Sequence, residues 1–279
     1  MLKIGFLGPK GTFSHEALKK YAEGLSYTAC DYNSIPEILM AVWNNEVDEA
    51  VTPIENSIEG AVNATLDMMA SEIDLMIKSE LIIPVRENLL VKKGTALADI
   101  KHVLSHPQPL GQCRNFLAEK LPKAHIKFTY STAGAAEEVS NGTGDSAAIG
   151  SIIAAEVYGL EIAAKDIHDC DNNSTRFVVV SQNDGEKTGH DKTSIVFSTE
   201  DKPGSLYRIL DIFNLWDINM SKIESRPAKN QLGRYIFFID VIGHRDDDDI
   251  KDALTMIKRK TSFFKFLGSY PEHTLSGNG

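Results

Sequence analysis

Cysteine, long apolar segments and positive charge are all scarce in this sequence. Its 279 residues include only three cysteines, Cys30, Cys113 and Cys170, an odd number at wide spacing. Such usage favours reduced thiols over a disulfide framework. We interpret all three as small core residues, with a reactive thiol as the alternative.

Signals for export and for membrane insertion are also lacking. No window approaches the ~18 apolar residues that span a bilayer, and the apolar run at the N-terminus soon meets Gly8 and Pro9. A signal peptide has a longer apolar region followed by a small-residue cleavage site. We therefore expect a cytoplasmic protein with no membrane partner.

Positive charge is outnumbered, with 29 Lys and Arg against 39 Asp and Glu and a net charge of −10. This balance argues against a nucleic-acid partner, so an anionic ligand must be bound by a local set of donors. Metal ligands lack suitable spacing, because a strand would separate His102 and His106 by about 13 Å, and we expect no metal. Neither a Ser-His-Asp arrangement nor an activated cysteine is evident.

What the sequence does contain is a regular alternation of apolar strands and amphipathic helices. The segments LKIGFL, SYTAC, DEAVTPIEN, HVLSH, IKFTY and SAAIGS each precede a helical pattern. This rhythm over residues 1–181 predicts α/β architecture with largely parallel sheets. The longer extended stretch over 74–93 interrupts the rhythm, and we interpret it as the point where the chain crosses from one sheet to another.

The pattern changes after Ser181. Residues 182–192 are polar, contain glycine and lack an apolar period, which predicts a linker. Residues 193–270 then follow the order β-α-β-β-α-β, which predicts a ferredoxin-like second domain, and 271–279 form a C-terminal tail. Apolar residues at i, i+3, i+4 and i+7 mark its two helices: Leu206, Ile209, Leu210 and Phe213, then Ile250, Ala253, Leu254 and Ile257.

Two polar motifs lie where predicted strands end. GPKGTFSHEA places Thr12 at a helix start, where free backbone N–H groups can bind an anion, although turn and cap chemistry explains it equally well. Its glycines do not have the spacing of a nucleotide-binding loop. TPIENSIEG places Glu55, Asn56 and Ser57 at the carboxyl end of a strand, where open α/β sheets bind ligands. A helix cap is the alternative for Asn56 or Ser57.

Two further motifs follow the same logic. In SHPQPLGQC, Ser105 ends a strand and Gln112 lies in the first turns of the next helix. In DNNSTRFVVV, Thr175 and Arg176 stand at the mouth of a strand whose valines indicate burial on both faces. Hydroxyls, amides, one arginine and one carboxylate suit positioning and electrostatic catalysis on a carboxylated small molecule, without a covalent intermediate.

Together these motifs, with STAGAAEEV, resemble in composition and order those of the prephenate dehydratases. KPGSLYRIL and IESRP resemble the ACT regulatory domain that such enzymes carry. The resemblance extends from Leu2 to about Tyr270. It implies two α/β lobes, as in periplasmic binding proteins, with the substrate in the cleft between them. It also implies that prephenate loses carbon dioxide and its ring hydroxyl to give phenylpyruvate, toward phenylalanine, without a cofactor.

The resemblance also implies roles for individual residues. Thr175 would lie in the cleft and donate a hydrogen bond to the departing hydroxyl, Arg176 would bind a substrate carboxylate, and Glu55 is the candidate acid. The other residues expected to bind substrate are Thr12, Asn56, Ser57, Ser105, Gln112 and Phe177. A regular strand directs Thr175 and Arg176 to opposite faces, so both can serve the cleft only if the strand begins irregularly.

For the second domain, the resemblance implies that phenylalanine binds between two ACT domains and regulates the enzyme. A paired site needs two subunits, so we expect a homodimer or homotetramer. The residues expected to bind the effector are Gly204, Ser205, Leu206, Asn219, Glu224, Ser225, Arg226 and Pro227. Ser205-Leu206-Tyr207 stands where the family commonly has Ala-Leu-Val.

Three other functions remain open at this point. The substrate of a dehydratase could be arogenate, the aminated relative of prephenate. Two lobes around a cleft also serve solute-binding proteins without catalysis, and the front half could be a degenerate enzyme in a regulatory protein. Because no chorismate mutase segment precedes Leu2, we expect a monofunctional enzyme.

Overall fold

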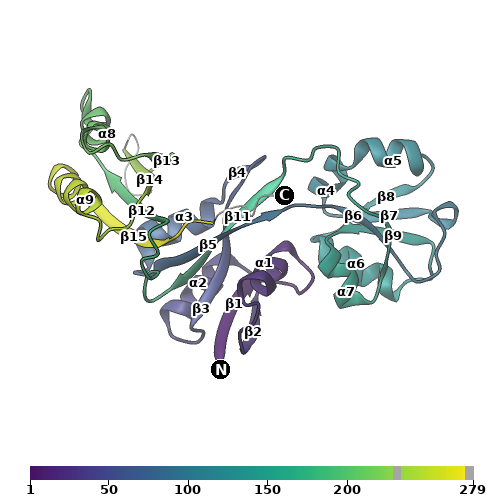
Figure 1. Ribbon diagram of the computed structural model, residues 1–279. Coiled ribbons are helices and arrows are strands. Elements are labelled where there is room, and N and C mark those ends of the chain that lie inside the picture. The colour runs from purple at the N-terminus through teal and green to yellow at the C-terminus, as the bar shows by residue number, and fades with distance from the viewer. Residues whose placement is uncertain (229–233, 274–279) are drawn as a thin grey trace. The chain divides into compact units, whose positions relative to one another are not determined.

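The computed structural model describes residues 1–228 and 234–273. Its first sheet has the strand order β2-β1-β3-β11-β5, with the short β4 paired to β3 (Figure 1). Strands β1 and β2 are parallel, in register from Leu2 opposite Tyr27 to Leu7 opposite Tyr32. The strands are β1 (Leu2–Leu7), β2 (Tyr27–Tyr32), β3 (Glu49–Asn56), β4 (Gly60–Ala61), β5 (Met76–Pro84) and β11 (Ser174–Ser181), and the helices between them are α1 (Phe13–Tyr21), α2 (Ile35–Trp43), α3 (Asn63–Asp67) and a π-helix (Met68–Glu72).

The second sheet has the order β10-β6-β9-β7-β8. Helices α4 and α5 cover one of its faces and α6 and α7 cover the other (Figure 1). Its elements are β6 (Asn88–Val91), β7 (His102–Ser105), α4 (Pro107–Gln112), α5 (Arg114–Lys120), β8 (His125–Phe128), α6 (Thr132–Asn141), β9 (Ser146–Gly150), α7 (Ile152–Tyr158) and β10 (Glu161–Ala164), with a short 3-10 turn at Leu97–Asp99.

Strand directions in this sheet differ in part from the sequence expectation. Strand β7 runs parallel to β8 and β9, as predicted, but β6 runs antiparallel to both β9 and β10. The reason is the stretch over 74–93, which supplies β5 to the first sheet and β6 to the second. Its interpretation as the crossing between sheets is confirmed, and a strand that enters a sheet from another one need not follow the parallel rule of strand–helix units.

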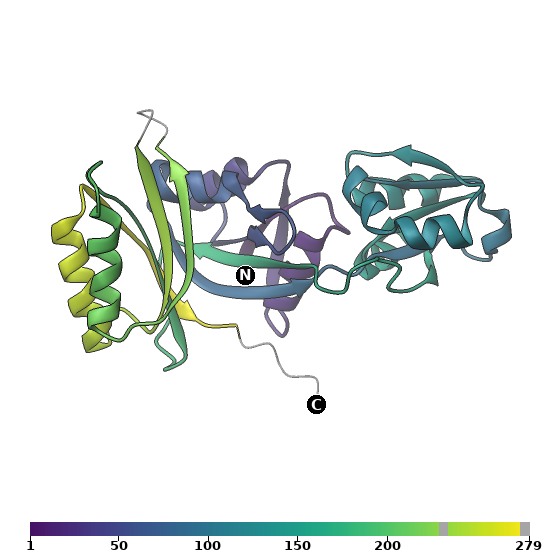
Figure 2. The same ribbon diagram turned by 90° about the horizontal axis from the view of Figure 1, so that it is seen from above.

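The last sheet has the antiparallel order β13-β14-β12-β15. Helices α8 and α9 lie side by side on one of its faces (Figure 2), and they bury Ile209, Phe213, Ile250 and Ile257 against it. The β-α-β-β-α-β prediction is confirmed. The elements are β12 (Asp191–Ser198), α8 (Ser205–Leu215), β13 (Met220–Pro227), β14 (Tyr235–Ile242), α9 (Asp248–Lys260) and β15 (Phe263–Pro271). Residues 182–190 contain no helix or strand, and part of the expected tail, 274–279, lies outside the described residues.

Two compact units make up the chain. The first comprises residues 1–38, 51–60 and 82–177, and the second comprises 39–50, 61–81 and 178–279. Helix α3, the π-helix and most of β5 therefore belong to the same unit as the last sheet. Within residues 1–228 and 234–273, no helix is both long and apolar enough to cross a membrane.

Two glycines allow the last domain to pack directly on β5 within the second unit. Gly268 of β15 has φ +138°, and a Cβ atom there would lie 2.3 Å from the Ile77 carbonyl oxygen. At Gly185, a Cβ atom would lie 2.6 Å from the Lys78 carbonyl oxygen. No side chain fits at such distances, so the backbone at these two glycines packs directly against the backbone of β5. Such close contact restricts movement of one segment along the other.

Candidate functional site

The expected site residues Asn56 and Thr175 meet where β3 ends and the neighbouring strand β11 begins. The Asn56 Nδ2 atom donates a hydrogen bond of 3.0 Å to the Thr175 Oγ1 atom. Thr175 is half-buried, so its hydroxyl does not point into packed hydrocarbon. A threonine that accepts through its oxygen keeps its own hydrogen for another acceptor.

The orientation of the Asn56 amide is determined by the backbone of the following turn. Its Oδ1 atom accepts hydrogen bonds from the N–H groups of Ile58 at 2.9 Å and Glu59 at 3.0 Å. Because the oxygen must face these two donors, the Nδ2 atom must face Thr175. Side-chain bonds of this kind are typical of Asn in tight turns.

Asn173 extends this arrangement and was not singled out in the sequence, although it lies in the quoted NNSTRF motif. It is 3% exposed. Its Oδ1 atom accepts from Asn56 Nδ2 at 2.9 Å, and its Nδ2 atom donates to Gln112 Oε1 at 3.1 Å. The signal that could have identified it is a polar residue two positions before Thr175 at the entrance of a buried strand.

Gln112, Asn173, Asn56 and Thr175 thus form a continuous hydrogen-bonded chain, which we term the amide chain. In the described part of the protein, neither the Thr175 hydroxyl hydrogen nor the Gln112 Nε2 group has an acceptor. The amide chain therefore offers a donor at each end. This arrangement can bind two oxygen atoms of one ligand and can stabilise negative charge on either of them.

Ser57 joins the two backbone segments that carry the amide chain. Its Oγ atom donates to the Asn172 carbonyl at 2.8 Å and accepts from the Ser174 N–H at 2.9 Å. The backbone N–H of Ser57 also donates to the Ser174 carbonyl at 2.9 Å. The hydroxyl hydrogen is used in this way, and Ser57 links the two segments and caps no helix.

Glu55 and Arg176 lie together on the other side of the same two strands. Since consecutive strand residues face opposite ways, Glu55 faces away from Asn56, and Arg176 faces away from Thr175. The Arg176 Nη1 and Glu55 Oε2 atoms are 3.9 Å apart, with side-chain exposures of 13% and 40%. Strand β11 runs from Ser174 to Ser181, so both Thr175 and Arg176 lie within it.

Two expected substrate-binding residues are structural instead. Phe177 is 2% exposed and is among the largest fully buried side chains, because β11 enters the core one residue after Arg176. Ser105 is 0% exposed, and its Oγ atom donates to the Ile149 carbonyl at 2.8 Å. Neither side chain is accessible to a ligand in this structure, so a substrate-binding role for either one remains only an expectation from the sequence.

Thr12 is also a structural group. Its Oγ1 atom accepts from the His15 N–H at 3.4 Å and lies within hydrogen-bond distance of the Leu7 and Pro9 carbonyls, which makes it the N-cap of α1. Turn and cap chemistry, the alternative stated from the sequence, therefore explains Thr12. Burial, followed by Lys19, lowers the pKa of His15 in the same turn.

The structure contains a buried carboxyl that the sequence did not indicate, and it lies close enough to Cys113 to act on its thiol. Glu87 is 1% exposed, and one of its carboxyl oxygens has no hydrogen-bond partner. Burial, and secondarily Glu16, raises its pKa to about 8. Burial also raises the pKa of Cys113, the neighbour of Gln112, with a further contribution from Glu87. Both groups are therefore protonated at neutral pH.

The three cysteines differ in their surroundings. Cys113 is buried, as expected of a core residue, whereas Cys30 is partly exposed and Cys170 is exposed. The core interpretation was therefore wrong for Cys170, because the segment that leads to β11 lies at the surface. Among residues 1–228 and 234–273, no three His, Cys, Asp or Glu side chains gather closely enough to hold a metal ion.

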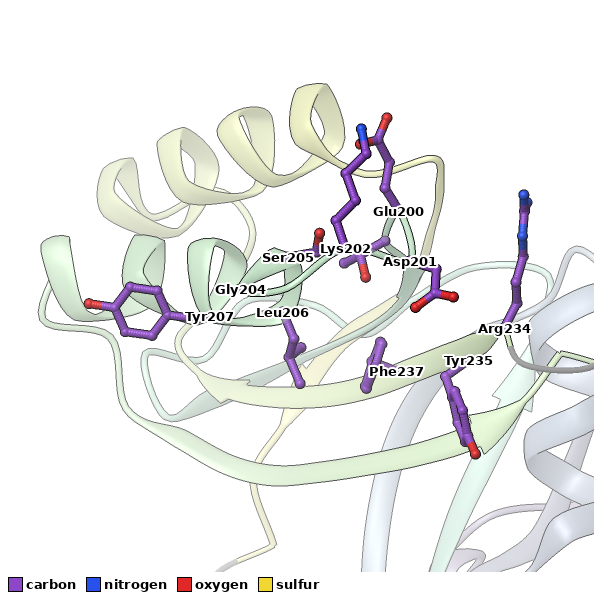
Figure 3. A pocket seen from close by; sticks show the side chains of 11 residues that line it. Glu200, Asp201, Lys202, Gly204, Ser205, Leu206, Tyr207, Arg234, Tyr235 and Phe237 are labelled. Atoms are coloured by element: carbon purple, nitrogen blue, oxygen red, sulfur yellow. The ribbon is translucent and has the colours of Figure 1, made fainter.

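The expected effector residues divide into two groups. Gly204, Ser205 and Leu206 line a cavity of about 290 Å³ at the start of α8, and Gly204 has φ +78°. Among the labelled side chains, Tyr207 points away from the others, and Tyr235 points away from the loop that carries Asp201 and Lys202 (Figure 3). The complete lining is Thr199, Glu200, Asp201, Lys202, Gly204, Ser205, Leu206, Tyr207, Arg234, Tyr235 and Phe237.

The second group, Asn219 and the stretch 224–227, is not part of this cavity lining. Asn219 is exposed and precedes β13, and its carbonyl accepts from the Ile242 N–H at 2.9 Å. The Arg226 guanidinium is bound to Asp67 of α3. Residues such as Lys202, Tyr235 and Phe237 were missed because a loop and a distant strand come together only in the folded domain.

Comparison with known proteins accounts for both parts of the chain. The family model for prephenate dehydratase matches residues 4–185, and the model for the ACT domain matches 193–255. A bifunctional chorismate mutase/prephenate dehydratase from Aquifex aeolicus is 40% identical over 275 residues, which are 98% of this chain and 75% of that protein.

Solved structures show the same fold over nearly the full chain. A prephenate dehydratase from Arthrobacter aurescens in complex with L-Phe has a TM-score of 0.89 at 38% identity, covering 97% of this chain and 90% of that one. GqqA, described as a quorum quenching acylase, has a TM-score of 0.87 at 28% identity, covering 97% and 98%. With motifs, fold and family model in agreement, this enzyme belongs to the prephenate dehydratase family and carries a C-terminal ACT domain.

Proposed function

We propose that this enzyme converts prephenate to phenylpyruvate, as a step of phenylalanine biosynthesis, and that the amide chain is its catalytic centre. In this reaction the ring carboxylate leaves as carbon dioxide, and the electrons of the broken C–C bond enter the ring. The C–O bond breaks at the same time, and its electron pair leaves with the hydroxyl oxygen. The observation that carries the proposal is the hydrogen bond from Asn56 to Thr175.

Thr175 would act on the leaving oxygen. As the C–O bond breaks, negative charge grows on that oxygen, and a donor positioned beforehand stabilises it more in the transition state than in the ground state. The Asn56 amide polarises the Thr175 hydroxyl by donating to its oxygen, which strengthens the bond that the hydroxyl donates. Thr175 needs to give up no proton for this role, because the hydroxyl oxygen leaves as hydroxide and is then neutralised by a proton from the buffered solution.

Gln112 provides the donor at the other end of the amide chain. Its Oε1 atom is occupied by Asn173, so the Nε2 group is left to face a ligand. We propose that it binds a carboxylate oxygen of prephenate and thereby orients the ring hydroxyl toward Thr175. Orientation of this kind is a large part of catalysis where no covalent intermediate forms.

Glu55 and Arg176 are better explained as a pair that supports the strands. The acid role considered for Glu55 depended on burial, but the side chain is 40% exposed and faces Arg176. We expect Glu55→Gln to leave the acid limb of the kcat/KM pH profile in place. A displaced limb in that profile would return Glu55 to the chemistry.

The regulatory cavity suits a free amino acid with an apolar side chain. Asp201 and Lys202 supply charges of both signs, and Leu206 and Phe237 supply an apolar surface. We propose that L-phenylalanine binds there and regulates the enzyme, which agrees with the L-Phe complex of the Arthrobacter relative. Glu224, Ser225 and Pro227 would contribute from a second subunit, and a homodimer or homotetramer would complete the site.

The direct test is formation of phenylpyruvate from prephenate by the purified chain, measured with and without phenylalanine. Arogenate, assayed in parallel, distinguishes the aminated substrate. Binding of prephenate without turnover would indicate a solute-binding protein, and hydrolysis of acylated substrates alone would indicate the activity described for GqqA. Either result would overturn the proposed function.

A further inference from the structure

Arg226, expected to bind the effector, is instead committed to the catalytic part of the chain. Its Nε atom lies 3.0 Å from Asp67 Oδ1 and its Nη2 atom 3.3 Å from Asp67 Oδ2, which is a two-pronged contact. Its Nη1 atom also donates to the Asn63 side-chain oxygen. The Arg226 and Asp67 side chains are only 17% and 21% exposed, so solvent screens this pair less than a surface ion pair.

A second cation of the ACT domain binds the far end of the same segment. The Lys265 Nζ atom, from β15, donates to the Ile73 carbonyl. Lys265 is partly buried, and this burial lowers its pKa, with Asp74 acting in the opposite direction. Arg226 and Lys265 therefore hold the start and the end of residues 63–73, which we term the 63–73 segment.

The backbone of this segment is itself unusual. Helix α3 ends at Asp67, and the next turn is a π-helix over Met68–Glu72. Such turns are rare, and they are enriched where a helix must change its winding for function. The transition lies at the residue that Arg226 binds, so a change in the Arg226–Asp67 contact acts where the helix is least regular.

The segment also continues directly from the proposed catalytic turn. Asn56 ends β3, its Oδ1 atom holds the N–H groups of Ile58 and Glu59, and β4 (Gly60–Ala61) leads into Asn63. Only a few residues separate Asn56, whose amide donates to Thr175, from Asn63, which accepts from Arg226. A shift of α3 would be felt at this turn, because so short a chain cannot absorb it.

From these contacts we infer that Arg226 and Lys265 are positioning residues for the reaction: they hold the 63–73 segment, and through it the Asn56 turn, in a place set by the ACT domain. Occupation of the effector site would displace β13 or β15 and thereby change the Asn56–Thr175 geometry. This inference rests on the proposed function. It assigns the coupling to two named contacts, and each must differ between the effector-bound and effector-free states.

The test is Asp67→Asn in the full-length chain, because Asp67 lies outside both the effector cavity and the amide chain. The substitution keeps the shape of the side chain and removes its charge. Phenylalanine binding is measured by calorimetry without substrate, and its effect on kcat/KM is measured with prephenate. Lys187→Gln is the matched control, since it removes an ion pair between the linker and the ACT domain, with Asp247 at 2.6 Å.

We expect Asp67→Asn to bind phenylalanine while its kcat/KM becomes nearly independent of phenylalanine, against the roughly 5- to 150-fold change typical of allosteric coupling. Lys187→Gln should respond as the wild type does. A wild-type response in Asp67→Asn would overturn the inference. Should this variant fail to fold, Lys265→Met tests the other contact by the same criterion.

The proposed function fails separately. A wild-type chain that forms no phenylpyruvate would overturn it before any variant is compared. A wild type that is active but indifferent to phenylalanine would overturn the regulatory part and the inference drawn from it.

Discussion

At the residue scale, the role proposed for the Thr175 hydroxyl depends on the groups around it. A free threonine is a poor acid and an ordinary donor. Here the Asn56 amide, itself oriented by two backbone N–H groups, occupies the acceptor side of the Thr175 oxygen. The hydrogen is therefore left to face a ligand.

Thr175→Ala should lower kcat by about 10²–10³-fold, the usual effect of removing one donor to a developing oxyanion. KM should change little, because the lost bond strengthens mainly in the transition state. Thr175→Ser keeps the hydroxyl and is the matched control. Steady-state rates with prephenate decide the matter, and near-normal turnover in the alanine variant would remove Thr175 from the mechanism.

Glu87 gives the fold a pH dependence of defined sign. Burial raises its pKa from the ordinary value of 4.5 to about 8, so between these values the folded chain keeps a proton that the unfolded chain releases. The free energy of unfolding is therefore highest below the pKa of the unfolded chain and falls as the pH rises toward the pKa of the folded chain. Over this range the folding equilibrium constant decreases by up to about tenfold per pH unit.

Glu87→Gln removes this titration while it keeps the shape of the side chain. We expect the variant to lose less stability than the wild type between pH 5 and about pH 8. Thermal unfolding midpoints measured across this range provide the comparison. Parallel curves for the two proteins would mean that Glu87 is already charged, or already paired, in the folded state.

At the scale of elements, the contact between β15 and β5 depends on glycine. Gly268→Ala would place a Cβ atom 2.3 Å from the Ile77 carbonyl oxygen at a φ of +138°. Gly189→Ala is the matched control, because Gly189 also has a positive φ, +89°, but has nothing within 4 Å. We expect Gly268→Ala to lower the unfolding midpoint clearly more than Gly189→Ala, and equal effects would show that the close approach contributes little.

The sequence was most informative about the helices and strands and their order along the chain. Periodicity identified the strand–helix units, the crossing at 74–93 and the βαββαβ domain, because burial of one face imposes its period on the sequence. Direction within the second sheet could not be predicted for β6, since pairing depends on which strand lies beside it in three dimensions.

Within the site, the sequence identified Asn56, Gln112 and Thr175, which the structure joins through Asn173. It could not separate Thr175 from Phe177, because one faces the amide chain and the other the core, and that difference arises from the elements packed around β11. Ser105 illustrates a similar ambiguity, because a hydroxyl at a strand end can face a ligand or, as here, donate to a neighbouring carbonyl.

At the scale of the whole molecule, the proposed effector site needs more than one subunit. We expect light scattering to give the mass of a dimer or tetramer. We also expect phenylalanine to raise the unfolding midpoint in proportion to the logarithm of its concentration, as a ligand of the folded state does. A monomeric mass with an unchanged midpoint would contradict the shared site.

The fixed direction of the amide chain has one more consequence. If the Asn56 side-chain amide were hydrolysed to aspartate, with release of ammonia, its NH2 group would be replaced by a carboxylate oxygen. The NH2 group only donates hydrogen bonds, whereas the carboxylate oxygen only accepts them. The Thr175 hydroxyl would then donate to the new carboxylate and no longer to the substrate. We expect such a molecule to be fully folded and inactive.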